Sequence, residues 1–411
     1  MSSGKPDKKP AKNPVRDRGE SIELMEPLLI GGDSRRRPAL TDLAVELAAK
    51  SAGFRRSLPE SLLSSLADLV RSMNCYYSNL IEGHDTHPID IERALKGDYS
   101  KDAKKRDLQL EAKAHITVQR WIDSGGLKGR AVTAESIREI HKRFCEQLPN
   151  DLLWVEDPAT KEKIKVIPGE FRDRAVAVGR HIPVRAPAVP RFLERFEEVY
   201  SNLGKTETII AAAAAHHRLA WIHPFLDGNG RVARLMSHAT LLDSLDTGGV
   251  WSIARGLARN VGAYKDHLAA CDLPRRNDLD GRGNLSEETL TEFTTFFLTA
   301  CIDQVSFMEN LMQPDRLRTR ILLWAEEEIR LNKIPPKSGA ILEAVLYRGE
   351  IPRAETPTIF AASERSASRF VSALIERGVL KSESTRAPLR LAFPAALAAR
   401  WMPGLFPERT S

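Results

Sequence analysis

The sequence has few cysteines, no long apolar run and little net charge. Only four cysteines occur in 411 residues, and none belongs to a Cys-x-x-Cys pair. This spacing argues against a disulfide scaffold or a zinc finger, so we expect reduced core cysteines. No apolar run is long enough to span a membrane, and the N-terminus lacks the apolar core of a signal peptide. We therefore expect a soluble, cytoplasmic protein without membrane contact.

The net charge of +6 is mild, and part of it lies near the N-terminus. Residues 5–18 read KPDKKPAKNPVRDR. A segment this rich in proline and lysine cannot bury a core, so residues 1–22 are predicted to form a disordered basic tail. Binding of nucleic acid by this tail is one alternative, and a solvated tail is the one we favour.

The chain after the tail has mainly helical periodicity. Apolar residues recur at helical spacing through residues 23–125, which predicts an N-terminal helical region. Thr133 is a predicted N-cap, and Ser286 is predicted to cap a helix over residues 287–312. Between residues 152 and 190 valines alternate with polar residues, which predicts a short β-hairpin or extended excursion.

A second unit is predicted after the proline pair at Pro335, which marks a boundary. Residues 312–336 are predicted as a helix and linker. Residues 337–405 have the pattern of three helices followed by two short strands, the layout of a winged helix. Arg365 and Arg369 share the outer face of the third helix, where they could contact DNA. A small interaction or dimerisation module with solvated arginines is the alternative, which we favour slightly because acidic residues adjoin both arginines.

Residues 221–234, WIHPFLDGNGRVAR, hold an unusual density of polar and glycine residues. An alanine-rich helix precedes them, and a second helix is predicted to start at about Arg231. Gly228, Asn229 and Gly230 therefore form a tight loop at a helix N-terminus, where free N–H groups suit a polyphosphate. Arg231 can clamp phosphate oxygens, and Arg234 lies along the same helix face.

Two further residues of this loop suit group transfer from a nucleotide. Asp227 is the only carboxylate of the loop, so it could hold a Mg²⁺ that bridges two phosphates. His223 lies at the loop mouth and is expected to have a pKa near neutrality, which suits a base that takes a proton from a hydroxyl nucleophile.

The string HPFLDGNGRVAR resembles the signature of Fic-domain proteins, His-Pro-Phe-x-(Asp/Glu)-Gly-Asn-Gly-Arg-x-x-Arg. The resemblance implies a helical Fic fold with a β-hairpin flap, placed here in a catalytic domain at 126–311. It also implies transfer of AMP from ATP to a Ser, Thr or Tyr hydroxyl of a protein. His223 would be the general base, Asp227 the Mg²⁺ ligand and Arg234 the partner of the γ-phosphate. The flap would be residues 171–183, which would hold a target segment by strand addition.

The same resemblance covers a segment that starts at Trp251 and looks like the nucleotide wall of the family. Many relatives carry two adjacent tyrosines there, and this chain has Tyr264 alone. Tyr264 is therefore the predicted contact with adenine.

A shorter motif, SNLIEG, occupies residues 78–83. Gly83 suits a helix C-cap, so Glu82 lies in the last turn, where a carboxylate is unfavourable without a cationic partner. The motif resembles the inhibitory motif of class II Fic proteins, (Ser/Thr)-x-x-x-Glu-(Gly/Asn), which begins here at Ser78. That resemblance implies that Glu82 binds Arg234 and blocks the productive position of the γ-phosphate. A solvated acid is the alternative.

These features together predict a self-inhibited protein adenylyltransferase that uses ATP and Mg²⁺ and also modifies itself. Gly230 stands where phosphate-transferring relatives have a lysine, which favours transfer of AMP. Removal of AMP with help from Glu82 is one alternative, and a DNA-binding regulator whose Fic domain senses nucleotide is another. Pure sensing is disfavoured because it needs no general base. The sequence specifies neither the target protein nor whether a homodimer forms.

Overall fold

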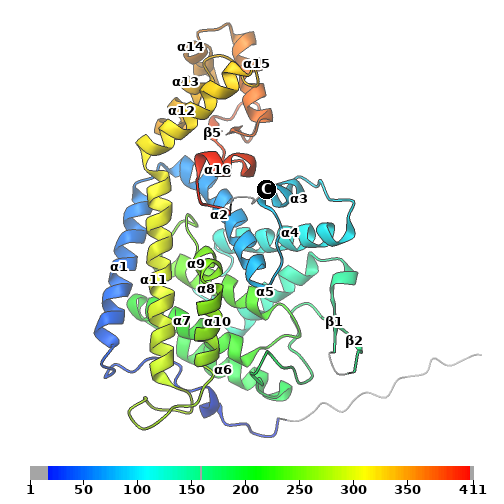
Figure 1. The fold of residues 1–411 in the computed structure, drawn as a ribbon, viewed down its shortest axis with the longest axis vertical. Helices are drawn as coiled ribbons and strands as arrows, with labels where there is room; N and C mark the ends of the chain where they lie inside the picture. The colour runs from blue at the N-terminus through cyan, green and yellow to red at the C-terminus, as the bar shows by residue number, and fades with distance from the viewer. Residues whose placement is uncertain (1–16, 158–159, 408–411) are drawn as a thin grey trace, which may run out of the picture.

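The structure, a computed structural model, describes residues 17–157 and 160–407 and is mainly helical, as predicted (Figure 1). The N-terminal helices are α1 (Arg37–Arg56), α2 (Glu60–Ile81), α3 (Pro88–Leu95) and α4 (Ala103–Asp123). The central helices are α5 (Ala134–Glu146), α6 (Val189–Tyr200), α7 (Lys205–Ile222), α8 (Asn229–Leu245), α9 (Ala254–Arg259), α10 (Val261–Ala270) and α11 (Glu287–Met312). The predicted caps are present, since Thr133 accepts from the N–H of Ser136 and Ser286 from that of Thr289.

Helices α7 and α8 are largely buried and pack against each other. The alanine run 211–215 of α7 is buried, and its short side chains let α8 pack closely against it. Helix α8 begins at Asn229, two residues before the predicted start, because Gly228 caps it with a φ of +79° that side chains disfavour. The packed pair fixes the loop between α7 and α8.

The C-terminal part follows α11 through α12 (Pro314–Arg330) and stands at the top of Figure 1. Its elements are α13 (Ser338–Arg348), β3 (Glu350–Ile351), α14 (Thr356–Phe360), α15 (Glu364–Glu376), β4 (Leu380–Lys381), β5 (Leu389–Leu391) and α16 (Ala398–Trp401). The strands form an antiparallel sheet in the order β3-β5-β4. Strand β3 was not predicted, since two residues are too few to show an alternating pattern. Helix α16 packs against α12, where the rings of Trp401 and Trp324 meet edge-on with centroids 5.2 Å apart.

Two predictions about extended or unstructured segments need correction. Residues 1–16 of the predicted tail lie outside the described residues, and the prediction of disorder is wrong for residues 17–22. Asp17 forms an ion pair with Arg191 at 2.8 Å, and the Glu20 carboxylate accepts a hydrogen bond from the N–H of Arg185. These acids meet donors that are distant in sequence, which composition does not reveal.

The predicted hairpin lies earlier in the chain than the expected flap. Strands β1 (Trp154–Glu156) and β2 (Lys163–Lys165) pair antiparallel. Within residues 171–183 the described pairing is a single bridge between Val178 and His181, around a tight turn. The expected flap is therefore an irregular segment whose conformation depends on side-chain bonds.

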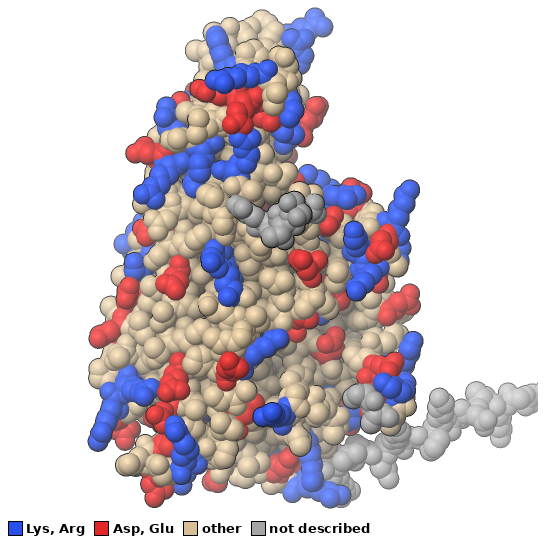
Figure 2. Space-filling model, in the orientation of Figure 1, with Lys and Arg blue, Asp and Glu red and all other residues tan. Residues whose placement is uncertain are grey.

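All four cysteines are free and buried, which confirms the prediction. Across residues 17–157 and 160–407, no helix combines the length and apolar character that crossing a membrane requires. Lys and Arg are interspersed with Asp and Glu over the face shown in Figure 2, in keeping with the mild net charge.

Candidate active site

The loop between α7 and α8 is closed by the side chain of Asn229. Its Oδ1 accepts from the N–H of Phe225 at 2.9 Å, and its Nδ2 donates to the carbonyl of Phe225 at 2.9 Å. The Phe225 ring is fully buried and stacks on His141, with centroids 3.9 Å apart. Because the amide of Asn229 is used within the loop, any contribution of this residue to a phosphate cradle falls to its backbone N–H.

His223 ends α7 in a left-handed conformation, with a φ of +51°. Its Nδ1 lies 3.3 Å from the carbonyl oxygen of Ala220. Burial lowers the pKa of His223 to about 4, and the positive charge of Arg172 acts in the same direction. The expectation of a pKa near neutrality is therefore wrong, because it ignored burial. The imidazole is neutral at physiological pH and can accept a proton without first losing one.

Arg172 is a residue of this site that the sequence did not single out. It is 3% exposed, and its Nε donates to the carbonyl of His223 at 2.8 Å. Other guanidinium nitrogens donate to the carbonyls of Arg174 at 3.0 Å and Ile222 at 3.3 Å, and to that of Val184. Arg172 thus ties both ends of the 171–183 segment to the turn that presents His223.

Asp227 is exposed on the same loop. No group of three His, Cys, Asp or Glu side chains that could hold a metal occurs among the described residues. A lone carboxylate fits Mg²⁺ that arrives with a nucleotide, because this ion usually binds one or two carboxylates together with phosphate oxygens. Asp227 is thus placed to hold such an ion, which would neutralise phosphate charge.

Arg231 lies at the start of α8 between an acid and an aromatic ring. Its Nη1 is 3.6 Å from Oε2 of Glu111, and its guanidinium carbon is 5.0 Å from the centre of the Phe144 ring. Glu111 also lies 3.1 Å from Nδ1 of His84. No local pattern in the sequence singled out Glu111, because its partners lie far along the chain, on α8 and in the loop after α2.

Arg234 meets both residues of the SNLIEG motif. Its Nε donates to Oγ of Ser78 at 2.9 Å, and Nη2 donates to the Ser78 carbonyl at 3.2 Å. The same Nη2 lies 2.5 Å from Oε1 of Glu82, the C-cap of α2. Burial opposes ionisation of Glu82, but the charge of Arg234 outweighs it, so the pKa of Glu82 is lowered. Glu82 and Arg234 therefore form an ion pair near the start of α8.

The loop between α7 and α8 lies in a segment that is similar to a known protein family. Residues 131–241 match the family model of the Fic/DOC family. This chain therefore contains a Fic domain. The matched part of the Fic domain begins just before α5, includes α7 and the loop that follows it, and ends within the last turns of α8.

Relatives of the Fic domain occur among curated proteins. The protein adenylyltransferase Fic of Drosophila erecta is 27% identical over 215 residues, which is 51% of this chain and 39% of that protein. The corresponding protein of Drosophila willistoni is 28% identical over 169 residues, 41% of this chain and 31% of that protein. The chain thus spans about two fifths or less of the length of these relatives.

A solved structure shares the fold. A Fic family protein from Desulfovibrio desulfuricans G20 superposes with a TM-score of 0.52 at 16% sequence identity, over 89% of this chain and 98% of that chain. The similarity extends well beyond the segment that the family model matches, and it supports a Fic fold for this chain.

Tyr264 of α10 is packed into the core against α7. Its side chain is buried, and its hydroxyl lies 2.7 Å from Nε2 of His216. Burial raises the pKa of Tyr264 to about 12. His216 also lies 2.9 Å from Oγ of Ser237 on α8. The structure thus places Tyr264 as a support of α7 and α8, and its contact with adenine stays a prediction.

Proposed function

We propose that this Fic-domain protein is a self-inhibited protein adenylyltransferase. It would transfer AMP from ATP to a Ser, Thr or Tyr hydroxyl of a target protein and of itself. The observation that carries the proposal is the ion pair between Glu82 and Arg234, next to a loop that presents a neutral histidine. The adenylyltransferase names of the Drosophila relatives support the same reaction.

In the proposed reaction, His223 accepts the proton of the attacking hydroxyl while that oxygen bonds to the α-phosphorus of ATP. The bond from the α-phosphorus to the bridging oxygen breaks, and diphosphate leaves. Backbone N–H groups of Gly228, Asn229 and Gly230 face the phosphates at the start of α8, and Arg231 and Arg234 supply positive charge.

The position of Glu82 supports self-inhibition. A carboxylate bound to Arg234 withholds that guanidinium from the terminal phosphate and places negative charge where phosphate charge would lie. ATP bound in this state would not present its α-phosphate in line with the attacking oxygen, and alignment governs such transfers.

The test compares incorporation of α-labelled and γ-labelled ATP by the full chain. We expect low incorporation by the wild type and strong incorporation of the α-label alone by Glu82→Gly. Adding His223→Ala should remove that signal, because loss of a general base costs about 10²–10⁴-fold. Glu376→Gly is a matched control, since Glu376 is an exposed acid in the last turn of α15. Equal incorporation by the wild type and Glu82→Gly would refute self-inhibition, and signal in the double variant would place the reaction elsewhere.

A further inference from the structure

Helix α2, which carries Glu82 at its C-terminal end, contacts residues 337–406 along its whole length. We call these residues the C-terminal module. At the start of α2, Gly349 approaches so closely that a Cβ there would lie 2.2 Å from Oγ of Ser61. In the middle, Nζ of Lys381 lies 2.7 Å from Oδ2 of Asp68. Near the end, the hydroxyl of Tyr77 donates to the carbonyl of Leu405 at 3.0 Å.

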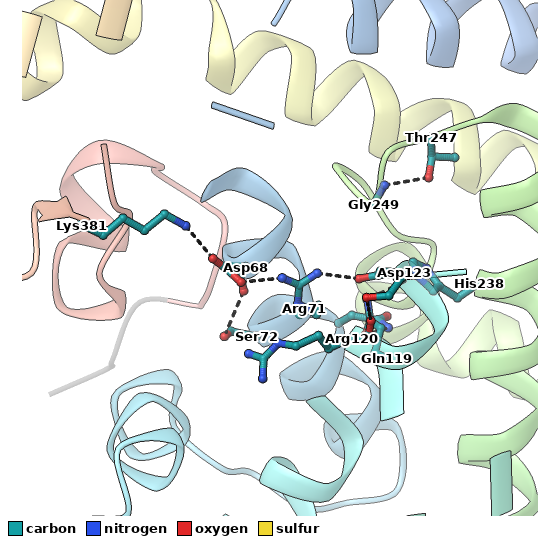
Figure 3. Close-up of polar contacts among 12 residues, drawn as sticks. Asp68, Arg71, Ser72, Gln119, Arg120, Asp123, His238, Thr247, Gly249 and Lys381 are labelled. Carbon is teal, nitrogen blue, oxygen red and sulfur yellow. Dashed lines mark hydrogen bonds and ion pairs between the residues drawn. The ribbon is translucent and has the colours of Figure 1, made fainter. Parts of the chain in front are cut away.

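The middle contact continues into the Fic domain as a chain of ion pairs (Figure 3). Asp68 binds Arg71 at 2.5 Å, Arg71 binds Asp123 at 2.8 Å, and Asp123 lies 2.7 Å from Nε2 of His238. The side chains of Arg71 and Asp123 are 10% exposed, so solvent screens their pairing little. His238 lies on α8 four residues after Arg234, which is one turn further along the same face.

The contact near the end of α2 is largely apolar and lies directly beside the ion pair of Glu82. The Tyr76 ring meets the Phe406 ring edge-on, with centroids 5.7 Å apart, and Tyr77 is 3% exposed. Ser78, the next residue, supplies the oxygens that hold Arg234 from the other side of the helix. The last turn of α2 is therefore held between the C-terminal module and Arg234.

We propose that the C-terminal module is a brake on the Fic site: its docking on α2 keeps Glu82 on Arg234, and undocking releases the site. The inference rests on the proposed function. Apart from these two sides, Asn79 and Ile81 of the last turn are buried in the core, while Glu82 ends the helix and Gly83 follows with a φ of +85°. Loss of the contacts of Tyr76 and Tyr77 would remove one of the two sides that hold this turn, and so weaken the hold of the Glu82 carboxylate on Arg234.

The polar docking contact in the middle of α2 is weak enough to break reversibly. The pair Lys381–Asp68 is partly exposed, with 34% and 47% of the side chains accessible, and such pairs contribute little to stability. A ligand that binds the undocked module more tightly than the docked one would therefore release Glu82. The shift would be set by the ratio of its affinities for the two states.

The experiment weakens docking without changing Glu82, Ser78 or Arg234. Three variants of the full chain are compared with the wild type: Tyr77→Phe, Lys381→Ala, and a triple variant that carries these two changes and Phe406→Ala. The matched controls are Tyr347→Phe, a module tyrosine that bonds Asp315, and Lys101→Ala, an exposed lysine on the N-terminal region. Hydrogen exchange of the backbone amides of residues 76–82 is measured together with incorporation of α-label.

Tyr77→Phe loses one hydrogen bond, so its hydrogen exchange and its incorporation of label should each rise about fivefold over the wild type. Incorporation by the triple variant should approach that of Glu82→Gly. The controls should match the wild type, and the docking substitutions should not raise incorporation further in a Glu82→Gly background.

The brake would be refuted if hydrogen exchange of residues 76–82 stayed at the wild-type rate in folded Tyr77→Phe and in the folded triple variant. This holds even if no variant incorporated label. Unchanged incorporation beside an active Glu82→Gly would overturn it as well. Failure of Glu82→Gly alone to incorporate label, with exchange still raised, would instead refute the proposed function. Tyr77→Phe removes a single oxygen atom. If the triple variant does not fold, Tyr77→Phe alone therefore tests the brake.

Discussion

The carboxylate of Glu82 occupies the space into which a side chain at position 230 would point. A Cβ built on Gly230 would lie 2.4 Å from Oε1 of Glu82 and 3.1 Å from Nη1 of Arg234. The absence of a side chain at Gly230 thus makes room for the ion pair. A larger residue there must displace Glu82, because the end of that side chain is the closest and most mobile neighbour.

Gly230→Ala should therefore destabilise the protein only while Glu82 is present. We expect a cost of about 1–3 kcal/mol in the wild type, from the partly buried ion pair that is lost. In a Glu82→Gly background the cost should vanish, because alanine favours a helix more than glycine does. Urea unfolding of the four proteins of this cycle measures the coupling. Equal costs in both backgrounds would show that position 230 and Glu82 do not interact.

The lowered pKa of His223 predicts a low acid limit for adenylylation. The imidazole is neutral above its pKa of about 4 and protonated below it, and only the neutral form can accept a proton. Incorporation by Glu82→Gly should thus stay level from about pH 8 to pH 5 and fall with a midpoint near pH 4. Return of samples to pH 7 controls for acid unfolding. A midpoint near 6.5, typical of an exposed histidine, would contradict the buried geometry.

Arg172 should influence turnover through the position of His223. Arg172→Met, made in the Glu82→Gly background, removes the bonds to the carbonyls of His223 and Ile222, and a misplaced base should lower kcat by about 10²-fold. It should also move the acid midpoint upward, because the charge of Arg172 lowers the pKa of His223. Arg172→Lys keeps the positive charge but not all of the hydrogen bonds. It should therefore preserve the lowered pKa of His223 better than it preserves kcat. Arg174→Met is the neighbouring control, and an effect of equal size there would remove Arg172 from this role.

Substitution of Arg365 and Arg369 tests whether the C-terminal module binds duplex DNA. Both are exposed on α15, in the part of the molecule where Figure 2 shows basic side chains beside acidic ones. If they contact phosphates, affinity of the full chain should fall steeply with salt, and replacing both by alanine should reduce the slope by about one unit per contact. Lys104→Ala with Lys105→Ala on α4 is the control. Binding that is absent or insensitive to salt would favour a protein-interaction module.

Local patterns predicted the helical elements well. The bounds of α11 match the predicted range 287–312, because its apolar spacing and the cap at Ser286 are properties of neighbouring residues. The juxtaposition of Glu82 with Arg234 was expected from a motif resemblance, and the structure places them in contact. Helix α3 was missed, since eight residues are too short for a clear period.

The features that were missed depend on tertiary surroundings. The pKa of His223 follows from burial, and the importance of Arg172 follows from carbonyls about 50 residues away along the chain. An arginine that binds carbonyls instead of carboxylates leaves no acidic partner in the sequence to suggest its role. The expected flap likewise takes its conformation from these bonds and not from alternation of its valines.

The burial of every cysteine gives this protein a clean background for site-specific labelling. Burial raises the pKa of Cys145 and Cys271 to about 12, and it also raises the pKa of Cys75 and Cys301. Almost none of these thiols is a thiolate at neutral pH, and the thiolate is the form that reacts with a maleimide. A dye offered to folded protein should therefore attach at a single cysteine introduced on the surface, so fluorescence can be read without first replacing native residues.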